Sequence, residues 1–207
     1  MNMIRDNESP SILIKHGNIN KKQIAFTYDT GTKDSETSEI LNVLKKNNVK
    51  CTFFTTGVWA NKFPALVNRI VSEGHEIANH SLDHPDMTQI SYSDMLKTVI
   101  EGEKAIKAVT GIKTTLFRHP FGHWNTEVLK AVGEAGYKYS IYWSIDTLDW
   151  TLPPMQSIVN RILVNSKNGD IVLMHIAGNN TAEATDRAIV NLEARQYKLV
   201  TVSTILK

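Results

Sequence analysis

The sequence QIAFTYDTGTKDSETSEILNVLKKNNVKCTFFT spans residues 23–55 and contains three segments of different character. Gln23–Tyr28 is rich in β-forming residues, Ser35–Asn47 places its apolar residues on one helical stripe, and Cys51–Thr55 is again rich in β-forming residues. A strand, a helix and a second strand in this order indicate two parallel strands joined by a crossover helix.

The same alternation continues through the rest of the 207 residues. Five further β-rich runs are Glu76–Asn79, Thr115–Arg118, Lys138–Ile145, Asp170–Met174 and Lys198–Val202. Helical spacing recurs at Phe63–Glu73, Ser91–Thr110, Thr126–Ala135, Met155–Asn165 and Ala182–Arg195. The pattern predicts an α/β fold, a distorted (β/α) barrel with about seven βα units, because a full barrel has eight and is usually longer. An open doubly wound sheet is the alternative.

Composition limits the class of protein. Hydrophobic residues make up 42% of the chain and charged residues 21%, which is typical of a globular domain. We expect one domain over residues 1–207, with residues 1–21 as an N-terminal extension. The net charge is +2 and no basic run exceeds two residues, which argues against a nucleic-acid partner. The single cysteine, Cys51, excludes an intramolecular disulfide and a Cys-rich zinc site.

The location of the protein follows less directly from the sequence. No apolar run approaches the roughly 20 residues that span a bilayer, so we expect no membrane span. The first residues, Met-Asn-Met-Ile-Arg-Asp-Asn-Glu, do not resemble a signal peptide. We expect a monomer that is secreted or associated with the cell wall after removal of a signal, or cytoplasmic if the chain is complete as it stands.

Polar side chains gather where the predicted strands end. In both candidate folds, functional groups belong at the carboxyl ends of the strands. Five predicted strands end in or lead into such groups: Asp29, His80 and His84, Arg118, Asp146 and Asp149, and His175. Each has a structural interpretation by itself, for example a turn residue for Asp29 or a core histidine for His175. Their occurrence together at successive strand ends predicts a catalytic site.

The segments around these residues form five motifs. They are Thr27-Tyr28-Asp29-Thr30-Gly31, His80-Ser81-Leu82-Asp83-His84, Arg118-His119-Pro120-Phe121-Gly122, Asp146-Thr147-Leu148-Asp149-Trp150 and Leu173-Met174-His175. In this order they resemble the motifs of the NodB-homology polysaccharide deacetylases, carbohydrate esterase family 4. The resemblance runs from about Lys22 to Thr204 and implies a distorted (β/α) barrel. It also implies hydrolysis of acetyl groups on peptidoglycan, chitin-like or xylan chains, so we expect a polysaccharide or oligosaccharide substrate.

The resemblance implies a role for each motif residue in proton transfer. Asp29 corresponds to the general base and Arg118 to the partner that pairs with it. His175 corresponds to the general acid, with Asp146 orienting and charging it. A carboxylate can remove a proton from the attacking water, and an imidazolium can protonate the leaving amine.

The resemblance also implies residues that bind the metal and the substrate. His80 and His84 correspond to ligands of a divalent metal, which polarises the carbonyl and lowers the pKa of bound water. Trp150 and Leu173 correspond to the walls of a pocket for the acetyl methyl group. The backbone N–H of Phe121 corresponds to the donor that stabilises the oxyanion.

One position departs from the family pattern. Thr30 stands where the family has an aspartate that ligates the metal. Two imidazoles remain, fewer than the three protein ligands usual in a catalytic zinc site. We therefore expect a weakly bound divalent ion, Zn²⁺ or Co²⁺, completed by water or by a nearby carboxylate such as Asp34, Asp83 or Asp86. His119 and His123 are also unusual near the third motif, and we expect both at the rim of the site.

Three functions remain open from the sequence. The first is metal-dependent deacetylation of an acetylated polysaccharide, either an N-acetyl amino sugar of peptidoglycan or chitin type or an O-acetyl xylan. The second is metal-independent hydrolysis of an amide on the same fold. The third is an inactive carbohydrate-binding domain. We favour the first, because the base, acid, arginine and pocket residues are all present.

Overall fold

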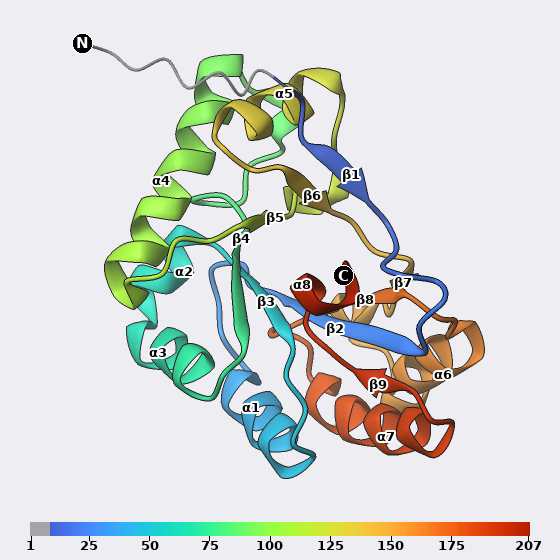
Figure 1. Cartoon of the computed structure of the whole chain (residues 1–207). Coiled ribbons are helices and arrows are strands. Elements are labelled where there is room, and N and C mark those ends of the chain that lie inside the picture. Colours follow the sequence, from blue (N-terminus) through green and yellow to red (C-terminus); the bar gives the residue numbers. More distant parts are fainter. Residues whose placement is uncertain (1–8) are drawn as a thin grey trace.

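The computed structural model describes residues 9–207 and has a curled, mostly parallel β-sheet at its centre (Figure 1). Its strands pair in the order β1-β6-β5-β4-β3-β2-β8-β7, and β9 pairs with β2. All pairs between these named strands are parallel. The bounds are β1 Ile12–Ile14, β2 Gln23–Asp29, β3 Thr52–Thr55, β4 Glu76–Asn79, β5 Leu116–Phe117, β6 Tyr139–Ile141, β7 Ile145–Asp146, β8 Asp170–His175 and β9 Lys198–Leu199. The predicted barrel-like α/β fold is confirmed.

Helices cover the outside of the sheet, except for the short C-terminal helix α8, which packs on the inner cluster (Figure 1). Their bounds are α1 Thr37–Lys46, α2 Gly57–Lys62, α3 Pro64–Ser72, α4 Tyr92–Thr110, α5 Thr126–Glu134, α6 Met155–Asn165, α7 Thr181–Ala194 and α8 Val202–Ile205. Short 3₁₀ turns are η1 Met87–Gln89, η2 Pro120–Gly122 and η3 Asp149–Thr151. Within residues 9–207, no helix has the length and apolar character needed to cross a membrane.

Alternation along β2 decides which side chains enter the barrel. Ile24, Phe26 and Tyr28 belong to the large core beneath the outer helices. Ala25 instead packs in a smaller inner cluster. Because successive side chains of a strand point to opposite faces, Asp29 lies on the same inward face as Ala25. The sequence pattern thus directs the carboxylate into the barrel.

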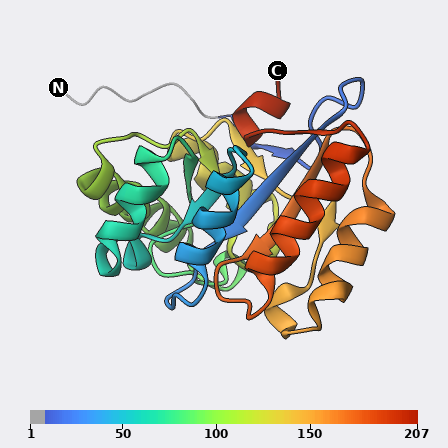
Figure 2. The same ribbon diagram turned by 90° about the horizontal axis from the view of Figure 1, so that it is seen from below.

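Helix α8 closes the amino end of the barrel. Val202 and Ile205 pack in the inner cluster with Ala25, and the backbone N–H of Val202 donates to Thr52 Oγ1 at 2.9 Å. Thr52 is the first residue of β3, so α8 lies at the end of the sheet opposite the strand termini that carry the polar motifs. Figure 2 shows α8 away from the arrowhead of β2.

Three segments differ from the sequence prediction. Ile12–Ile14, expected in an N-terminal extension, forms β1 and pairs with β6. The predicted strand Lys138–Ile145 is divided into β6, which pairs with β1 and β5, and β7, which pairs with β8. The predicted strand Lys198–Val202 is shortened to β9, since α8 begins at Val202.

Candidate active site

A pocket of about 540 Å³ opens at the carboxyl ends of the strands. Five motifs contribute to its wall, and the side chains that matter for the chemistry are Asp29, His80, His84, Phe121, Asp146, Trp150, Leu173 and His175. The structure therefore brings together the side chains that the sequence had predicted to converge, with Arg118 buried directly behind Asp29.

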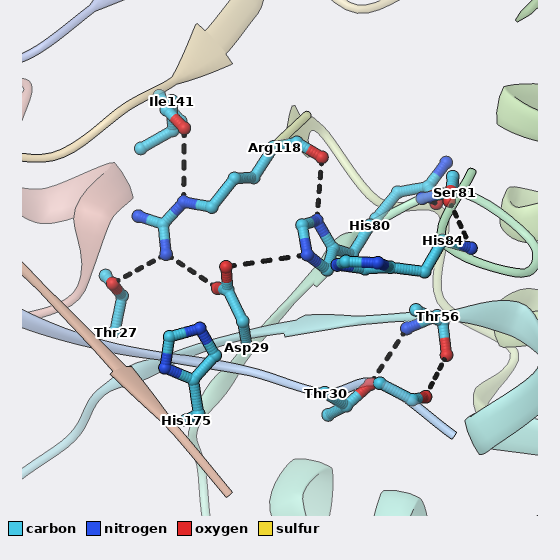
Figure 3. Close-up of polar contacts among 12 residues, drawn as sticks. Thr27, Asp29, Thr30, Thr56, His80, Ser81, His84, Arg118, Ile141 and His175 are labelled. Carbon is cyan, nitrogen blue, oxygen red and sulfur yellow. Dashed lines mark hydrogen bonds and ion pairs between the residues drawn. The ribbon is translucent and has the colours of Figure 1, made fainter. Parts of the chain in front are cut away.

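Arg118 holds the Asp29 carboxylate inside the barrel (Figure 3). Its Nη1 donates to Asp29 Oδ1 at 2.7 Å and to Thr27 Oγ1 at 2.8 Å, and its Nε donates to the carbonyl of Ile141 at 3.1 Å. Burial alone would raise the pKa of Asp29, but the adjacent charge of Arg118 is the main cause that outweighs it and lowers that pKa. Asp29 is therefore a carboxylate at neutral pH.

His175 lies opposite Asp29 on the neighbouring strand. The two residues are register partners between β2 and β8. The Nδ1–H of His175 donates to Asp149 Oδ1 at 2.8 Å, because an ionised carboxylate can only accept. Burial disfavours the imidazolium, but this hydrogen bond and the charge of Asp149 raise the pKa of His175 above its ordinary value. The pKa shifts therefore favour a negative charge on Asp29 and a positive charge on His175.

The hydrogen-bond partner of His175 is Asp149, which corrects the prediction that Asp146 orients this histidine. The charge of Asp146 still contributes to raising the pKa of His175. Asp146 lines the pocket, but its Oδ1 accepts the backbone N–H of Leu148 at 2.8 Å. Leu148 has a left-handed backbone with φ of 54°, and the turn that follows directs Asp149 to His175. The motif alone does not distinguish its two carboxylates.

His80 and His84 lie side by side with their ring centroids 4.8 Å apart. The Nδ1–H of His80 donates a hydrogen bond to the carbonyl of Arg118 at 2.8 Å, and its Nε2 lies 3.5 Å from Asp29 Oδ2 (Figure 3). Burial lowers the pKa of His80 to about 4 and also lowers the pKa of His84. Both imidazoles are neutral at pH 7 and keep the lone pairs that a metal ligand needs.

Thr30 does not replace the missing carboxylate. Its Oγ1 is buried and accepts the backbone N–H of Thr56 at 3.0 Å. The three alternative carboxylates are bound elsewhere: Asp34 by Thr37, Asp83 by Thr98, and Asp86 by Thr88 and His123. Over residues 9–207, no group of three or more His, Cys, Asp or Glu side chains is arranged to hold a metal ion. The residues present fit an ion held by the two histidine nitrogens and otherwise by water.

The pocket wall combines apolar and aromatic side chains. Leu173 is 3% exposed on β8, whereas Trp150 is 58% exposed on η3. Phe121 adopts a left-handed backbone with φ of 58°, and its ring packs edge-on against His84. Trp143, which the motifs did not include, also lines the pocket and stacks on Tyr142.

The two unusual histidines occupy different places. His123 lies at the pocket, as expected, with Nδ1 2.8 Å from Asp86 Oδ2. His119 does not lie at the rim: it is 1% exposed and packs edge-on against Phe117. The alternation that points Arg118 inward turns the next residue toward the cluster beneath α4 and α5.

Comparison with known protein families agrees with the motifs found at this site. The sequence profile described as "Polysaccharide deacetylase" matches residues 16–140. The chain belongs to the polysaccharide deacetylase family. A peptidoglycan-N-acetylglucosamine deacetylase of Bacillus cereus is 35% identical over 192 residues, which cover 91% of this chain and 90% of the relative. In Listeria monocytogenes, a peptidoglycan-N-acetylglucosamine deacetylase is also 35% identical, but the match covers only 39% of that longer protein.

Solved structures place the chain in carbohydrate esterase family 4. The Bc1960 peptidoglycan N-acetylglucosamine deacetylase superposes with a TM-score of 0.89 at 32% identity, over 93% of this chain and 92% of that one. BA3943 of Bacillus anthracis, described as a pseudoenzyme of this family, superposes with a TM-score of 0.91 at 32% identity, over 96% and 70%. A mutant of BA3943 is described as having restored enzymatic activity. The family thus includes both deacetylases and a protein without activity in its natural form.

Proposed function

We propose that this polysaccharide deacetylase family member hydrolyses the acetyl group from an N-acetyl amino sugar of peptidoglycan or chitin type. One observation carries the proposal: Asp29 and His175 are register partners on adjacent strands, and their pKa values are shifted in opposite directions. Pairs of titratable groups separated in this way are typical of a general base and a general acid. The acetylated glucosamine and muramic acid units named for the relatives support this substrate class.

The reaction needs one proton removed and one supplied. Asp29 would accept a proton from water as the water oxygen attacks the acetyl carbonyl carbon. His175 would donate its Nε2 proton to the sugar nitrogen as the C–N bond breaks, giving acetate and a free amine. Arg118 keeps the base ionised, and Trp150 and Leu173 would enclose the methyl group. Phe121 would present its backbone N–H to the oxyanion.

A divalent ion, Zn²⁺ or Co²⁺, would be held by His80 and His84. When bound, such an ion polarises the carbonyl and increases the acidity of water. With Thr30 in place of a carboxylate, we expect weak binding that is lost on purification.

Two other functions have specific support. Metal-independent amide hydrolysis is supported by the two-histidine site, and an inactive carbohydrate-binding domain is supported by the similarity to BA3943. The O-acetyl group of xylan is a further substrate to test.

An acetate-release screen separates these functions. The substrates are chitooligosaccharides, peptidoglycan and acetylated xylan, each with added Zn²⁺ or Co²⁺, with no addition, and with a chelator. We expect acetate from an N-acetylated glycan, more of it with added metal, and none with the chelator. Turnover that survives chelation would favour the metal-independent hydrolase, and glycan binding without acetate release would favour the binding domain.

A further inference from the structure

The Asp149 carboxylate is held by three donors in a place with no solvent exposure. Its Oδ1 accepts the Nδ1–H of His175 at 2.8 Å, and its Oδ2 accepts the backbone N–H of His175 at 2.7 Å. The third donor is the hydroxyl of Thr181, whose Oγ1 lies 2.8 Å from Oδ2. Thr181 begins α7, so this support comes from outside both η3 and β8.

Close packing fixes the Thr181 hydroxyl against the carboxylate. Thr181 is fully buried. A Cβ atom at Gly178 would collide with Thr181 Oγ1 and would lie 3.4 Å from Asp149 Oδ2. Only glycine at position 178 leaves room for this contact, because every other residue would displace the hydroxyl.

The first turn of α7 is also tied to the strand that carries Asp29. Thr185 Oγ1 donates to the carbonyl of Thr181 at 2.8 Å. Its oxygen can then accept from the Tyr28 hydroxyl, which lies 3.0 Å away. Tyr28 immediately precedes Asp29 on β2 and is fully buried. These contacts hold the main chain of α7 against β2 and do not involve the Thr181 hydroxyl.

We propose that Thr181 is the positioning residue of the Asp149–His175 pair. Its hydroxyl keeps the Asp149 carboxylate in one orientation, with Oδ1 on the His175 Nδ1 proton and Nε2 of His175 left for the pocket. Thr181 is not one of the pocket-lining residues, so it acts through Asp149 alone. The catalytic meaning of this arrangement rests on the proposed function, but the arrangement itself can be tested without activity.

Four variants separate positioning from packing. Thr181→Val removes the hydroxyl and keeps the shape of the side chain. Thr181→Ala removes both the hydroxyl and the methyl group, and Thr181→Ser keeps the hydroxyl. Thr185→Val is the matched control, because it removes a buried hydroxyl from the same helix without touching Asp149.

The first readout is the proton NMR signal of the His175 Nδ1–H in protein labelled with ¹⁵N-histidine. We expect a downfield, slowly exchanging signal in the wild type, Thr181→Ser and Thr185→Val, and its loss in Thr181→Val and Thr181→Ala. The second readout is kinetic. We expect kcat to fall about 10-fold to 100-fold in Thr181→Val with KM unchanged, the order of loss when an outer partner of a functional histidine is removed, and to recover in Thr181→Ser.

Two results would overturn the proposal. One is an unchanged Nδ1–H signal in the folded Thr181→Val or Thr181→Ala protein. The other is an equal loss of kcat in Thr185→Val, which would mean that Thr181 contributes only to helix packing. If the wild type releases no acetate, the proposed function fails, while the NMR signal still decides whether Thr181 positions His175.

Discussion

Opposite charges on Asp29 and His175 set the expected pH dependence. The base must be ionised, and the pKa of Asp29 is lowered by Arg118 and His80 despite burial. The acid must be protonated, and the pKa of His175 is raised by Asp149 despite burial. We predict a plateau of kcat/KM that begins above about pH 4, where His80 loses its proton, and extends above the usual pKa of a histidine, about 6.5. A decline of kcat/KM already below pH 6.5 as the pH rises would contradict this assignment.

The two carboxylates of the fourth motif should behave differently. Asp149→Asn removes the charge that holds His175 protonated, and we predict a loss of kcat of about 10²–10⁴-fold, the usual value of a positioned acid. Asp146→Asn removes a carboxylate that accepts from Leu148 and acts on His175 only through its charge, so its loss of kcat should be at least tenfold smaller. Steady-state kinetics on one acetylated substrate compares them. Equal losses would show that Asp146 has a role in proton transfer.

Thr30 should limit the affinity for metal. With two imidazoles as protein ligands, the wild type should bind Zn²⁺ or Co²⁺ weakly, and Thr30→Asp should bind at least tenfold more tightly because it adds a charged oxygen. Calorimetric titration measures both, and His80→Ala is the control that should abolish binding. If the wild type binds as tightly as Thr30→Asp, another group supplies the third ligand. In Thr30→Asp, the new carboxylate lies beside Asp29, and their repulsion raises the pKa of one of the two when no metal is bound. The effect of this variant on kcat is therefore measured separately from its effect on metal affinity.

At the scale of the elements, the strand-end rule predicted most of the site from sequence. The rule placed Asp29 at the carboxyl end of the first predicted strand, beside the other functional groups. The same rule could not identify the partner of His175, because that depends on the left-handed backbone at Leu148. It also could not find the break between β6 and β7, since the two halves pair with different strands that are distant in sequence. Local pattern predicts strands and their faces, whereas long-range contacts decide where strands stop.

Several non-glycine residues with a left-handed backbone lie in the loops at the pocket end of the barrel. Non-glycine residues with positive φ include Ser81, His84, Phe121, Leu148 and Leu152, all in or beside the motif loops. Such conformations cost about 1–3 kcal/mol each and persist only where surrounding structure holds them. In this chain they direct the second, third and fourth motifs toward the pocket, which the sequence could indicate only through the motifs themselves.

The wall formed by η3 and β8 should select the acyl group. If Trp150 and Leu173 enclose an acetyl methyl, then propionyl and butyryl analogues of the same glycan should have kcat/KM at least tenfold lower. Competition assays with matched acylated oligosaccharides measure this ratio. Leu173→Ala enlarges the pocket and should reduce the difference in kcat/KM between the acetyl substrate and its longer analogues. Equal turnover of all three acyl groups by the wild type would contradict the assignment.

At the scale of the whole molecule, buried neutral histidines should limit stability in acid. Burial lowers the pKa of His75 to about 4 and that of His119 to about 3. The unfolded chain binds these protons from about pH 6.5 downward while the folded chain does not, so the free energy of unfolding should fall between about pH 6.5 and 4. Urea denaturation across this range measures the loss.

His119→Leu provides the control for that prediction. Within residues 9–207, neither ring nitrogen of His119 has a hydrogen-bond partner, so an apolar side chain should be tolerated. The variant should take up about one proton fewer on unfolding near pH 5 and should be less sensitive to acid. An unchanged pH dependence would show that His119 is already protonated or satisfied in the folded protein.

The central claim, a deacetylase whose base is Asp29, is tested most directly by acetate release from N-acetylated glycan with added Zn²⁺ or Co²⁺. The comparison is between the wild type and Asp29→Asn, which keeps the shape of the side chain and removes the base. We predict measurable release by the wild type and a kcat lower by about 10²–10⁴-fold in a variant whose circular dichroism shows the native fold. Near-normal turnover in Asp29→Asn, or no release by the metal-supplemented wild type on any acetylated glycan, would contradict the claim.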